Sequence, residues 1–161
     1  MLTLRPASSD DAPLIVGFIR DLALYEKDPE AAVVTEADIL RDGFGEKPFF
    51  QVVIAEWAGE PAGFAFYFFN YSTWLGRPGL YLEDLFVQPA HRGRGIGKAL
   101  LQHLAAIAVG AGCGRMDWQV LDWNEPSIRF YEALGARHMK GWLTMRLEGD
   151  SLLRAGGASQ A

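Results

Sequence analysis

The sequence predicts an α+β (mixed α/β) fold in which a mostly antiparallel sheet is flanked by helices. Apolar residues recur at helical spacing near the N-terminus and again after residue 95. Between these segments, three apolar runs separated by turn residues predict consecutive antiparallel strands. After residue 95, helical and strand patterns alternate. This order of elements is typical of a mixed sheet in one unit.

The first third of the chain is predicted to hold one strand and two helices. Residues 2–5 form a short strand. Pro13 lies in the first turn of the first helix, where its missing N–H costs little. Helical spacing extends that helix to about Glu26, with the apolar positions Leu14, Phe18, Leu22 and Tyr25. Residues 35–38 resemble a capping box and begin a brief helix that ends near Asp42.

The middle of the chain is predicted to form a hairpin, a loop and a further strand. Residues 50–56 and 61–69 are apolar and flank a short turn, so they predict two paired strands. A loop over residues 70–79 carries Trp74. Residues 80–87 form a nearly continuous apolar strand that two adjacent acids interrupt.

The last part of the chain is predicted to alternate helix and strand. The apolar face of residues 96–110 indicates a helix, and residues 116–121 indicate a strand. A second helix begins at residue 124 or 125 and ends at Gly135. Residues 142–147 alternate as a closing strand, and residues 154–161 are expected to fray. We therefore expect a single domain over residues 1–150 and a partly disordered tail over residues 151–161.

Composition and charge argue against several classes of protein. No apolar run approaches the roughly 20 residues that span a bilayer, and the N-terminal residues lack a signal-peptide pattern, so we expect a cytoplasmic protein that does not bind membranes. The net charge is −5, and no basic run extends beyond Arg92 and Arg94. Nucleic-acid binding is disfavoured, because its proteins carry clustered basic residues.

The single cysteine, Cys113, excludes an internal disulfide and a multi-cysteine metal site. It is interpreted as a structural thiol, with a nucleophilic role as the alternative. The three histidines, His91, His103 and His138, do not have metal-ligand spacing, so we expect no metal.

A glycine-rich turn between the strand at 80–87 and the helix at 96–110 is the most informative segment. Gly93, Gly95 and Gly97 allow close approach of a ligand to the backbone, and N–H groups at a helix N-terminus attract phosphate. The dinucleotide pattern fails because Lys98 stands where its third glycine belongs. The triphosphatase loop fails as well, because it needs a glycine at residue 92 and a serine or threonine at residue 99. A turn without a ligand remains the alternative.

The pattern Arg-x-x-Gly-x-Gly at residues 92–97 resembles the pyrophosphate-binding turn of the GNAT superfamily of N-acetyltransferases. The chain is most similar to the diamine acetyltransferase branch, which includes spermidine/spermine and thialysine acetyltransferases. The stretches that carry this resemblance are residues 24–26, 42–46, 71–74, 81–84, 122–127, 130–131 and 134–136. The resemblance implies a GNAT-like fold whose sheet is splayed at the cofactor site, and acetyl-CoA as cosubstrate.

The resemblance also implies which residues hold the two substrates. Those expected to bind acetyl-CoA are Leu85, Phe86, Val87, Arg92, Gly93, Arg94, Gly95, Ile96, Gly97, Lys98, Asn124 and Ser127. Those expected to bind the amine are Tyr25, Glu26, Trp74, Asp84 and Trp142.

Acetyl transfer to an alkylamine requires that a proton be removed, because an amine with a pKa of about 10 is mostly protonated at neutral pH. By resemblance, Glu83 helps to remove that proton through water and Tyr131 protonates the departing thiolate. In a regular strand Glu83 and Asp84 would face opposite sides, whereas the family has a bulge here. The alternatives are that the two acids are a solvent-edge residue and a salt-bridge partner, and that Tyr131 is a core aromatic.

The expected acceptor is a small-molecule primary amine: a diamine, a polyamine or a thialysine- or lysine-like amine. Polyamine acetyltransferase has acids at the positions of Ser72 and Lys140, which disfavours a long polycation. The alternatives are transfer to a protein amine, a CoA-binding module without catalysis and, less favoured, a nucleotide-binding protein. By resemblance, the enzyme is a homodimer.

Overall fold

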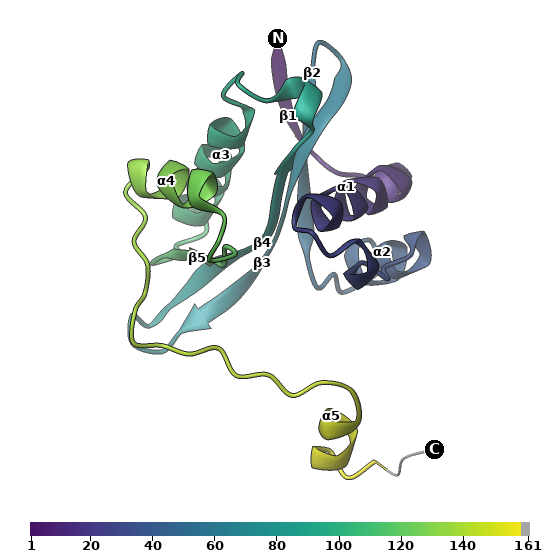
Figure 1. Ribbon diagram of the computed structural model, residues 1–161, viewed down its shortest axis with the longest axis vertical. Coiled ribbons are helices and arrows are strands. Elements are labelled where there is room, and N and C mark those ends of the chain that lie inside the picture. Colours follow the sequence, from purple (N-terminus) through teal and green to yellow (C-terminus); the bar gives the residue numbers. More distant parts are fainter. Residues whose placement is uncertain (159–161) are drawn as a thin grey trace. The chain divides into compact units, whose positions relative to one another are not determined.

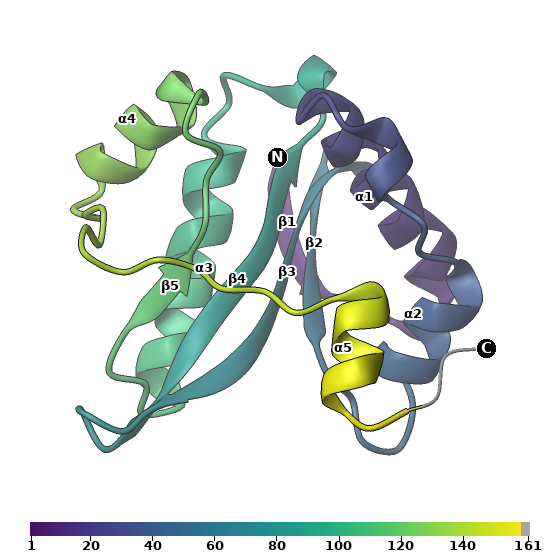
Figure 2. The ribbon, with the colours of Figure 1, turned by 60° about the horizontal axis from the view of Figure 1, so that its bottom comes forward.

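The computed structural model describes residues 1–158, which fall into two compact units. The first unit is Met1–Leu121, and the second begins at Asp122. The first contains a sheet with helices on both faces (Figures 1 and 2). The predicted mixed α/β class is confirmed.

The sheet has five strands in the order β1-β2-β3-β4-β5. Neighbouring strands are antiparallel except for the parallel pair β4–β5. Their bounds are Leu2–Pro6 for β1, Gln51–Trp57 for β2, Glu60–Ser72 for β3, Arg77–Val87 for β4 and Met116–Trp118 for β5. The long pair β3–β4 is the frame on which the candidate site is built.

Helices α1 (Ala12–Tyr25) and α2 (Glu36–Gly43) lie on one face of this sheet, and α3 (Ile96–Gly110) lies on the other (Figures 1 and 2). The capping box at α2 is present. The Asp38 N–H donates to the Thr35 hydroxyl at 3.2 Å, and the Thr35 N–H donates to the Asp38 carboxylate at 2.9 Å. Short 3₁₀ turns lie at Ser9–Asp11, Pro29–Ala31 and Pro89–His91.

The core on the α1 face is built around aromatic rings. Phe18 of α1 stacks on Phe64 of β3 with ring centroids 5.2 Å apart, and it meets the edge of Phe86 of β4 at 6.4 Å. All three side chains are buried. This packing holds α1 against β3 and β4, because aromatic side chains bury large apolar areas.

A bulge interrupts β4 at Glu83. Phe66 of β3 pairs with Asp84, whereas the next residue, Tyr67, pairs with Leu82, so Glu83 is the extra residue of β4. On the other side of β4, pairing with β5 ends at Leu82 and Trp118. Beyond Leu82, β4 is therefore bonded to β3 alone among residues 1–121. The sheet splits at the two acids.

Two sequence-based predictions about strand lengths need correction. The loop predicted over residues 70–79 is shorter and comprises only residues 73–76, because β3 continues to Ser72 and β4 begins at Arg77. The buried Ser72 closes the turn by accepting the N–H of Leu75 at its hydroxyl, 3.1 Å away. The strand predicted over 116–121 is also shorter, since β5 ends at Trp118.

The second unit contains α4 (Glu125–Ala133) and α5 (Gly149–Ala155). The closing strand predicted over residues 142–147 is wrong, because the described chain has no strand in this segment. Arg154 and Ala155, expected to fray, belong to α5. Residues 159–161 of the expected tail lie outside the described residues.

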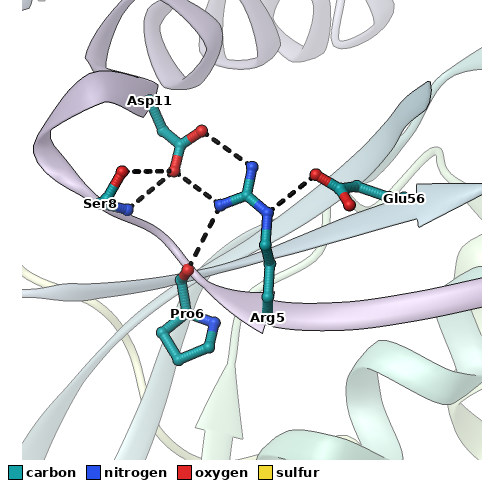
Figure 3. Close-up of polar contacts among 5 residues, drawn as sticks. All are labelled: Arg5, Pro6, Ser8, Asp11 and Glu56. Atoms are coloured by element: carbon teal, nitrogen blue, oxygen red, sulfur yellow. Dashed lines mark hydrogen bonds and ion pairs between the residues drawn. The ribbon is translucent and has the colours of Figure 1, made fainter. Parts of the chain in front are cut away.

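Arg5 of β1 forms hydrogen bonds to β2 and to the segment before α1 (Figure 3). The Arg5 guanidinium donates to both oxygens of Asp11, at 2.8 and 3.0 Å, and to Glu56 of β2 at 2.8 Å. Asp11 also accepts the Ser8 N–H at 2.7 Å. Hydrogen bonds from Arg5 hold the pKa of the Asp11 carboxyl below its usual range. The cluster joins β1, β2 and the segment before α1.

We expect Arg5→Gln to lower the Tm at pH 7 by about 5 °C, because charge-assisted bonds of a partly buried cluster are lost. The lowered pKa of Asp11 means that this stabilisation is present above its unfolded pKa near 3.8 and is lost as the pH falls through the folded value. The difference in Tm between Arg5→Gln and the wild type should therefore shrink as the pH falls below about 3.8. Thermal melts over a pH series measure it.

The matched control is Arg41→Gln, which removes the exposed pairs of Arg41 with Asp38 and Asp42. Exposed ion pairs contribute little, so this Tm should change much less. Equal losses in the two variants would contradict a special role for the Arg5 cluster.

Candidate functional site

The bulge in β4 places two adjacent carboxylates on one cavity. Glu83 and Asp84 both line it, although consecutive residues of a regular strand face opposite sides. The bulge that the resemblance implies is present, and its extra residue shifts the alternation of side chains. Neither acid forms an ion pair with another residue of the described chain. The alternative that one of these two acids is a salt-bridge partner is therefore wrong.

Asp84 is half-buried and has an unusual ionisation. Burial, with smaller contributions from the negative charges of Glu83 and Glu26, raises the pKa of Asp84 from 3.8 to about 7. A cation beside such a carboxyl group stabilises its ionised form and lowers its pKa, because opposite charges attract. This acid therefore favours a positively charged ligand in the cavity.

The cavity has a volume of about 500 Å³ and lies within the first unit. That volume is in the usual range for small-molecule sites, about 300–1,000 Å³. Four phenylalanines line it, together with aliphatic side chains of α1, α2 and the segment before α2. These residues are Phe49, Phe50, Phe66, Phe68, Ile19, Val34 and Ile39. Two acids of α2, Asp38 and Asp42, complete the lining.

The end of α1 brings a third carboxylate toward Asp84. Glu26 is the C-cap of α1, and its N–H donates to the Leu22 carbonyl at 2.8 Å. Burial raises the pKa of Glu26, and its charge contributes to the raised pKa of Asp84. Tyr25, directly before it, lies under the Arg92 guanidinium, 5.0 Å from the ring centroid. The structure thus brings together the predicted residues Glu26, Glu83 and Asp84.

The glycine-rich turn has the conformation of an anion-binding loop. Gly93 and Gly95 have φ of 78° and 75°, which glycine adopts readily, and a side chain at either position would point into open space. Gly95 is the N-cap of α3, a helix of 15 residues. Within residues 1–158, the N–H groups of residues 93–98 donate to no backbone carbonyl. These groups fit a pyrophosphate, which requires several converging donors.

The two arginines of this turn pack against aromatic rings. Arg92 lies over Tyr25 and over Phe86, at 5.0 and 5.6 Å, and its Nε donates to the Val87 carbonyl at 3.0 Å. Arg94 lies over Trp57 at 5.0 Å. Both keep their positive charge, so they add to the field that attracts an anion at the turn.

Leu85, Phe86 and Val87 pair with β3 on one side of β4, opposite Ala65, Phe64 and Gly63. The side of β4 where β5 pairs at residues 80–82 has no such partner at residues 85–87 in the first unit. This geometry leaves strand backbone groups available beside the glycine-rich turn.

The remaining predicted residues are on other segments. Trp74 is exposed in the turn between β3 and β4 and does not line the cavity. Asn124, Ser127, Tyr131 and Trp142 belong to the second unit. Asn124 is the N-cap of α4, where its side-chain oxygen accepts the Ser127 N–H at 3.4 Å. Tyr131 is half-buried on α4, which has no fully buried residue, and its ring lies 5.3 Å from that of Phe130.

Sequence reasoning did not identify the walls of the cavity. Phe64, Phe66 and Phe68 alternate along β3, so the face that packs on Phe18 continues into the cavity. Asp38 and Asp42 are four residues apart and share one side of α2. Both periodicities are visible in the sequence, but only the position of α2 against β3 shows that they meet.

Cys113 is half-buried and follows the C-terminal end of α3. A helix of 15 residues is about 22 Å long, so this thiol is far from the turn at the other end. Among residues 1–158, no group of three or more His, Cys, Asp or Glu is placed to hold a metal ion. No helix of the described chain is long and apolar enough to span a bilayer.

Comparison with known proteins identifies the family. Residues 15–136 match the model of the acetyltransferase (GNAT) family, a match that includes parts of both units. Thialysine N-epsilon-acetyltransferase of Sus scrofa is 39% identical over 96% of each chain. Spermidine/spermine N(1)-acetyltransferase-like protein 1 of Homo sapiens is 39% identical over 93% of this chain and 23% of that longer protein.

Among solved structures, an integron cassette protein from the mobile metagenome of V. cholerae has a TM-score of 0.82. It is 27% identical, and the match covers 98% of both chains. The predicted fold, family and diamine branch are confirmed, as is the prediction of an N-acetyltransferase. The chain therefore belongs to the acetyltransferase (GNAT) family.

Proposed function

We propose that the enzyme transfers the acetyl group of acetyl-CoA to the primary amine of a small molecule by direct attack in a ternary complex. The observation that carries the proposal is the bulge at Glu83, which gives one cavity two adjacent carboxylates where the sheet splits. The acetyltransferase relatives that act on thialysine support a small amine as acceptor. A panel of amines with acetyl-CoA, followed by thiol release, tests this function.

In the proposed reaction, acetyl-CoA supplies an acyl group activated as a thioester. Asp84, next to Glu26, holds the ammonium group of the acceptor. Glu83 takes a proton from that group through water, and the free nitrogen then attacks the acyl carbon. As the carbon–sulfur bond breaks, Tyr131 donates its phenolic proton to sulfur, and the nitrogen loses its second proton as the amide forms. That proton returns through solvent to the Tyr131 phenolate, and Glu83 releases the first proton to solvent.

We propose that the turn at residues 93–98 binds the pyrophosphate of CoA. Its unbonded N–H groups and the positive charges of Arg92, Arg94 and Lys98 support this assignment. Leu85, Phe86 and Val87 would offer backbone groups to the acetyl and pantetheine parts, because no second strand pairs with them among residues 1–121. Asn124 and Ser127 are proposed to contact the pantetheine arm.

We propose that residues 1–150 act as one transferase domain in a cytoplasmic homodimer that binds neither nucleic acid nor membranes. The family match across both units supports the single domain. Exposed apolar side chains in the second unit support the dimer: Leu143 and Met145 are each 87% exposed. An apolar run of this kind is typical of an interaction surface, and we assign it to a second copy of the chain.

We expect Gly95→Val to weaken CoA binding at least tenfold, about 1.4 kcal/mol. A branched side chain is strained at φ 75°, and it would disturb the N–H groups that we assign to the pyrophosphate. Gly59→Val is the matched control, because Gly59 has φ 85° and open space in the turn between β2 and β3. If calorimetry gives both folded variants the same CoA affinity, the turn has only a structural role.

We expect Glu83→Gln to lower kcat most near neutral pH and less at higher pH, because free amine then forms without help from the enzyme. Steady-state rates from pH 6 to pH 10 measure this. A loss of equal size at every pH would indicate that Glu83 positions the substrate instead of removing a proton.

Asp84→Asn is the companion variant to Glu83→Gln. Because the pKa of Asp84 is about 7, its ionised fraction rises through neutral pH, and the wild-type KM for a cationic amine should fall over that range. Glu26 and Glu83 are the charges that raise this pKa, and the α2 acids Asp38 and Asp42 share the cavity. The fall in KM should disappear in Asp84→Asn and persist in Glu83→Gln. Its persistence in Asp84→Asn would contradict cation binding by Asp84.

We expect Tyr131→Phe to lower kcat about a hundredfold while the Kd for CoA changes little, since general acids contribute about 10²–10⁴-fold. The hydroxyl acts only as charge develops on sulfur, so ground-state binding does not depend on it. Tyr71→Phe, at an exposed position of β3, is the control. If the Tm drops and kcat is unchanged in Tyr131→Phe, the residue has a packing role and the assignment as acid is wrong.

A further inference from the structure

The glycine-rich turn contains a stretch of backbone whose N–H groups are kept out of the hydrogen bonding on either side. Before this stretch, the Arg92 N–H donates to the Pro89 carbonyl at 3.3 Å. After it, the helical bonding of α3 begins with the Ala99 N–H, which donates to the Gly95 carbonyl at 3.0 Å. In between, the N–H groups of residues 93–98 donate to no backbone carbonyl within residues 1–158. A turn that keeps these donors available for a ligand needs another source of order.

Arg94 lies at the centre of this turn, between two glycines. Gly93 and Gly95 both have positive φ, and a side chain at either position would meet open space. Packing at the two glycines therefore does not restrain the turn, and glycine loses more conformational freedom on ordering than other residues. The Arg94 side chain, in contrast, makes a contact with the sheet.

The sheet residue that Arg94 contacts is Trp57. The Arg94 guanidinium lies over the indole ring, with its central carbon 5.0 Å from the ring centroid. Its Nη1 also lies 3.4 Å from Nδ1 of His91. A guanidinium within about 6 Å of a ring centroid and over its face is attracted to the ring, and tryptophan gives the strongest attraction. This contact restricts the position of Arg94 and of the backbone that carries it.

Trp57 is itself held firmly by the sheet. It is the last residue of β2, and its backbone pairs with Leu2 of β1 on one side and with Glu60 of β3 on the other. Trp57 is also half-buried. A turn attached to such a residue loses less conformational freedom when a ligand binds, which strengthens binding.

We propose that Trp57 is a positioning residue for the acyl donor, acting through Arg94 to hold residues 93–98 in the arrangement that receives the pyrophosphate of CoA. This inference rests on the proposed function. It adds a residue of β2, remote in sequence from the glycine-rich motif, to the residues on which binding of the donor depends. Arg92 is held in a similar way over Tyr25 of α1, so both arginines of the turn are attached to rings of the first unit.

The first test measures the Kd of CoA by calorimetry on the full chain. Trp57→Leu should raise this Kd about fivefold, because Arg94 keeps its charge but loses its position, whereas Trp57→Phe should stay within about twofold because a phenyl ring still offers a face. Phe69→Leu, which alters a partly exposed ring of β3 outside the cavity, is the control and should not change the Kd.

Three results of this test would overturn the inference. An unchanged Kd in folded Trp57→Leu would show that the charge of Arg94 is sufficient without the ring. An equal loss in Phe69→Leu would show that the effect is not specific to Trp57. Absence of CoA binding by the wild type would overturn the proposed function, and this inference with it.

A double-mutant cycle tests whether Trp57 acts through Arg94. Arg94→Gln should weaken CoA binding at least as much as Trp57→Leu does. Trp57→Leu should then cause no further loss in the Arg94→Gln background, because the contact is already absent. Additive losses would show that the two residues act independently and would overturn the positioning role.

Shortened ligands locate the effect on CoA. Dephospho-CoA keeps the pyrophosphate and lacks the 3′-phosphate, so Trp57→Leu should weaken CoA and dephospho-CoA by the same factor. A loss confined to CoA would assign Arg94 to the 3′-phosphate and overturn its assignment to the pyrophosphate turn.

S-acetylpantetheine has no phosphate, so its kcat and KM as acyl donor should be unchanged in Trp57→Leu. With acetyl-CoA, the KM should rise and the kcat should stay the same. A lower kcat, or an equal rise in KM for both donors, would indicate a general defect of the fold and would overturn the role of Trp57 in positioning the turn.

Discussion

The extra residue in β4 is the constraint on which the site depends. Without Glu83 as a bulge, Asp84 and Glu83 would lie on opposite faces of the sheet, and only one of them could line the cavity. Bulges locally disrupt a ladder. Here the long pairing of β3 with β4 on both sides of the bulge keeps the strand in place. The same irregularity coincides with the end of pairing to β5, so the acids and the available strand backbone lie at one point of the sheet.

The charged residues around the bulge in β4 differ in their pairing from other carboxylates of the molecule. Several other carboxylates have an arginine partner: Asp11 and Glu56 pair with Arg5, and the α2 acids pair with Arg41. At Asp84, by contrast, burial and then the negative charges of Glu83 and Glu26 raise the pKa of the carboxyl group. A positive charge beside Asp84 would lower this pKa again, which is the electrostatic basis of the role that we propose for Asp84 in binding an amine.

Local patterns predicted most elements because they reflect interactions between neighbours in sequence. The helix at 12–25 and the capping box before α2 follow from spacing alone. The bulge did not follow from the residues and was expected only by resemblance, because the register of β4 depends on its partner strand. At residues 142–147 a local pattern predicted an element that is not formed. The residues alternate as in a strand, but a strand also needs a partner strand. The four phenylalanines that line the cavity could likewise not be identified without the position of α2 against β3.

Arg92 shows why a motif and its geometry have to be considered together. The sequence pattern assigns this arginine to a phosphate group, while the structure places its guanidinium over Tyr25 and Phe86 and its Nε on the Val87 carbonyl. The two roles are compatible, because stacking uses the faces of the guanidinium, and one bond uses one of its five N–H donors. Through Tyr25, the cation that orients the glycine-rich turn is also packed on the end of α1, directly before Glu26. A single side chain thus links the segment assigned to the acyl donor with the end of α1, which carries one of the acids assigned to the acceptor.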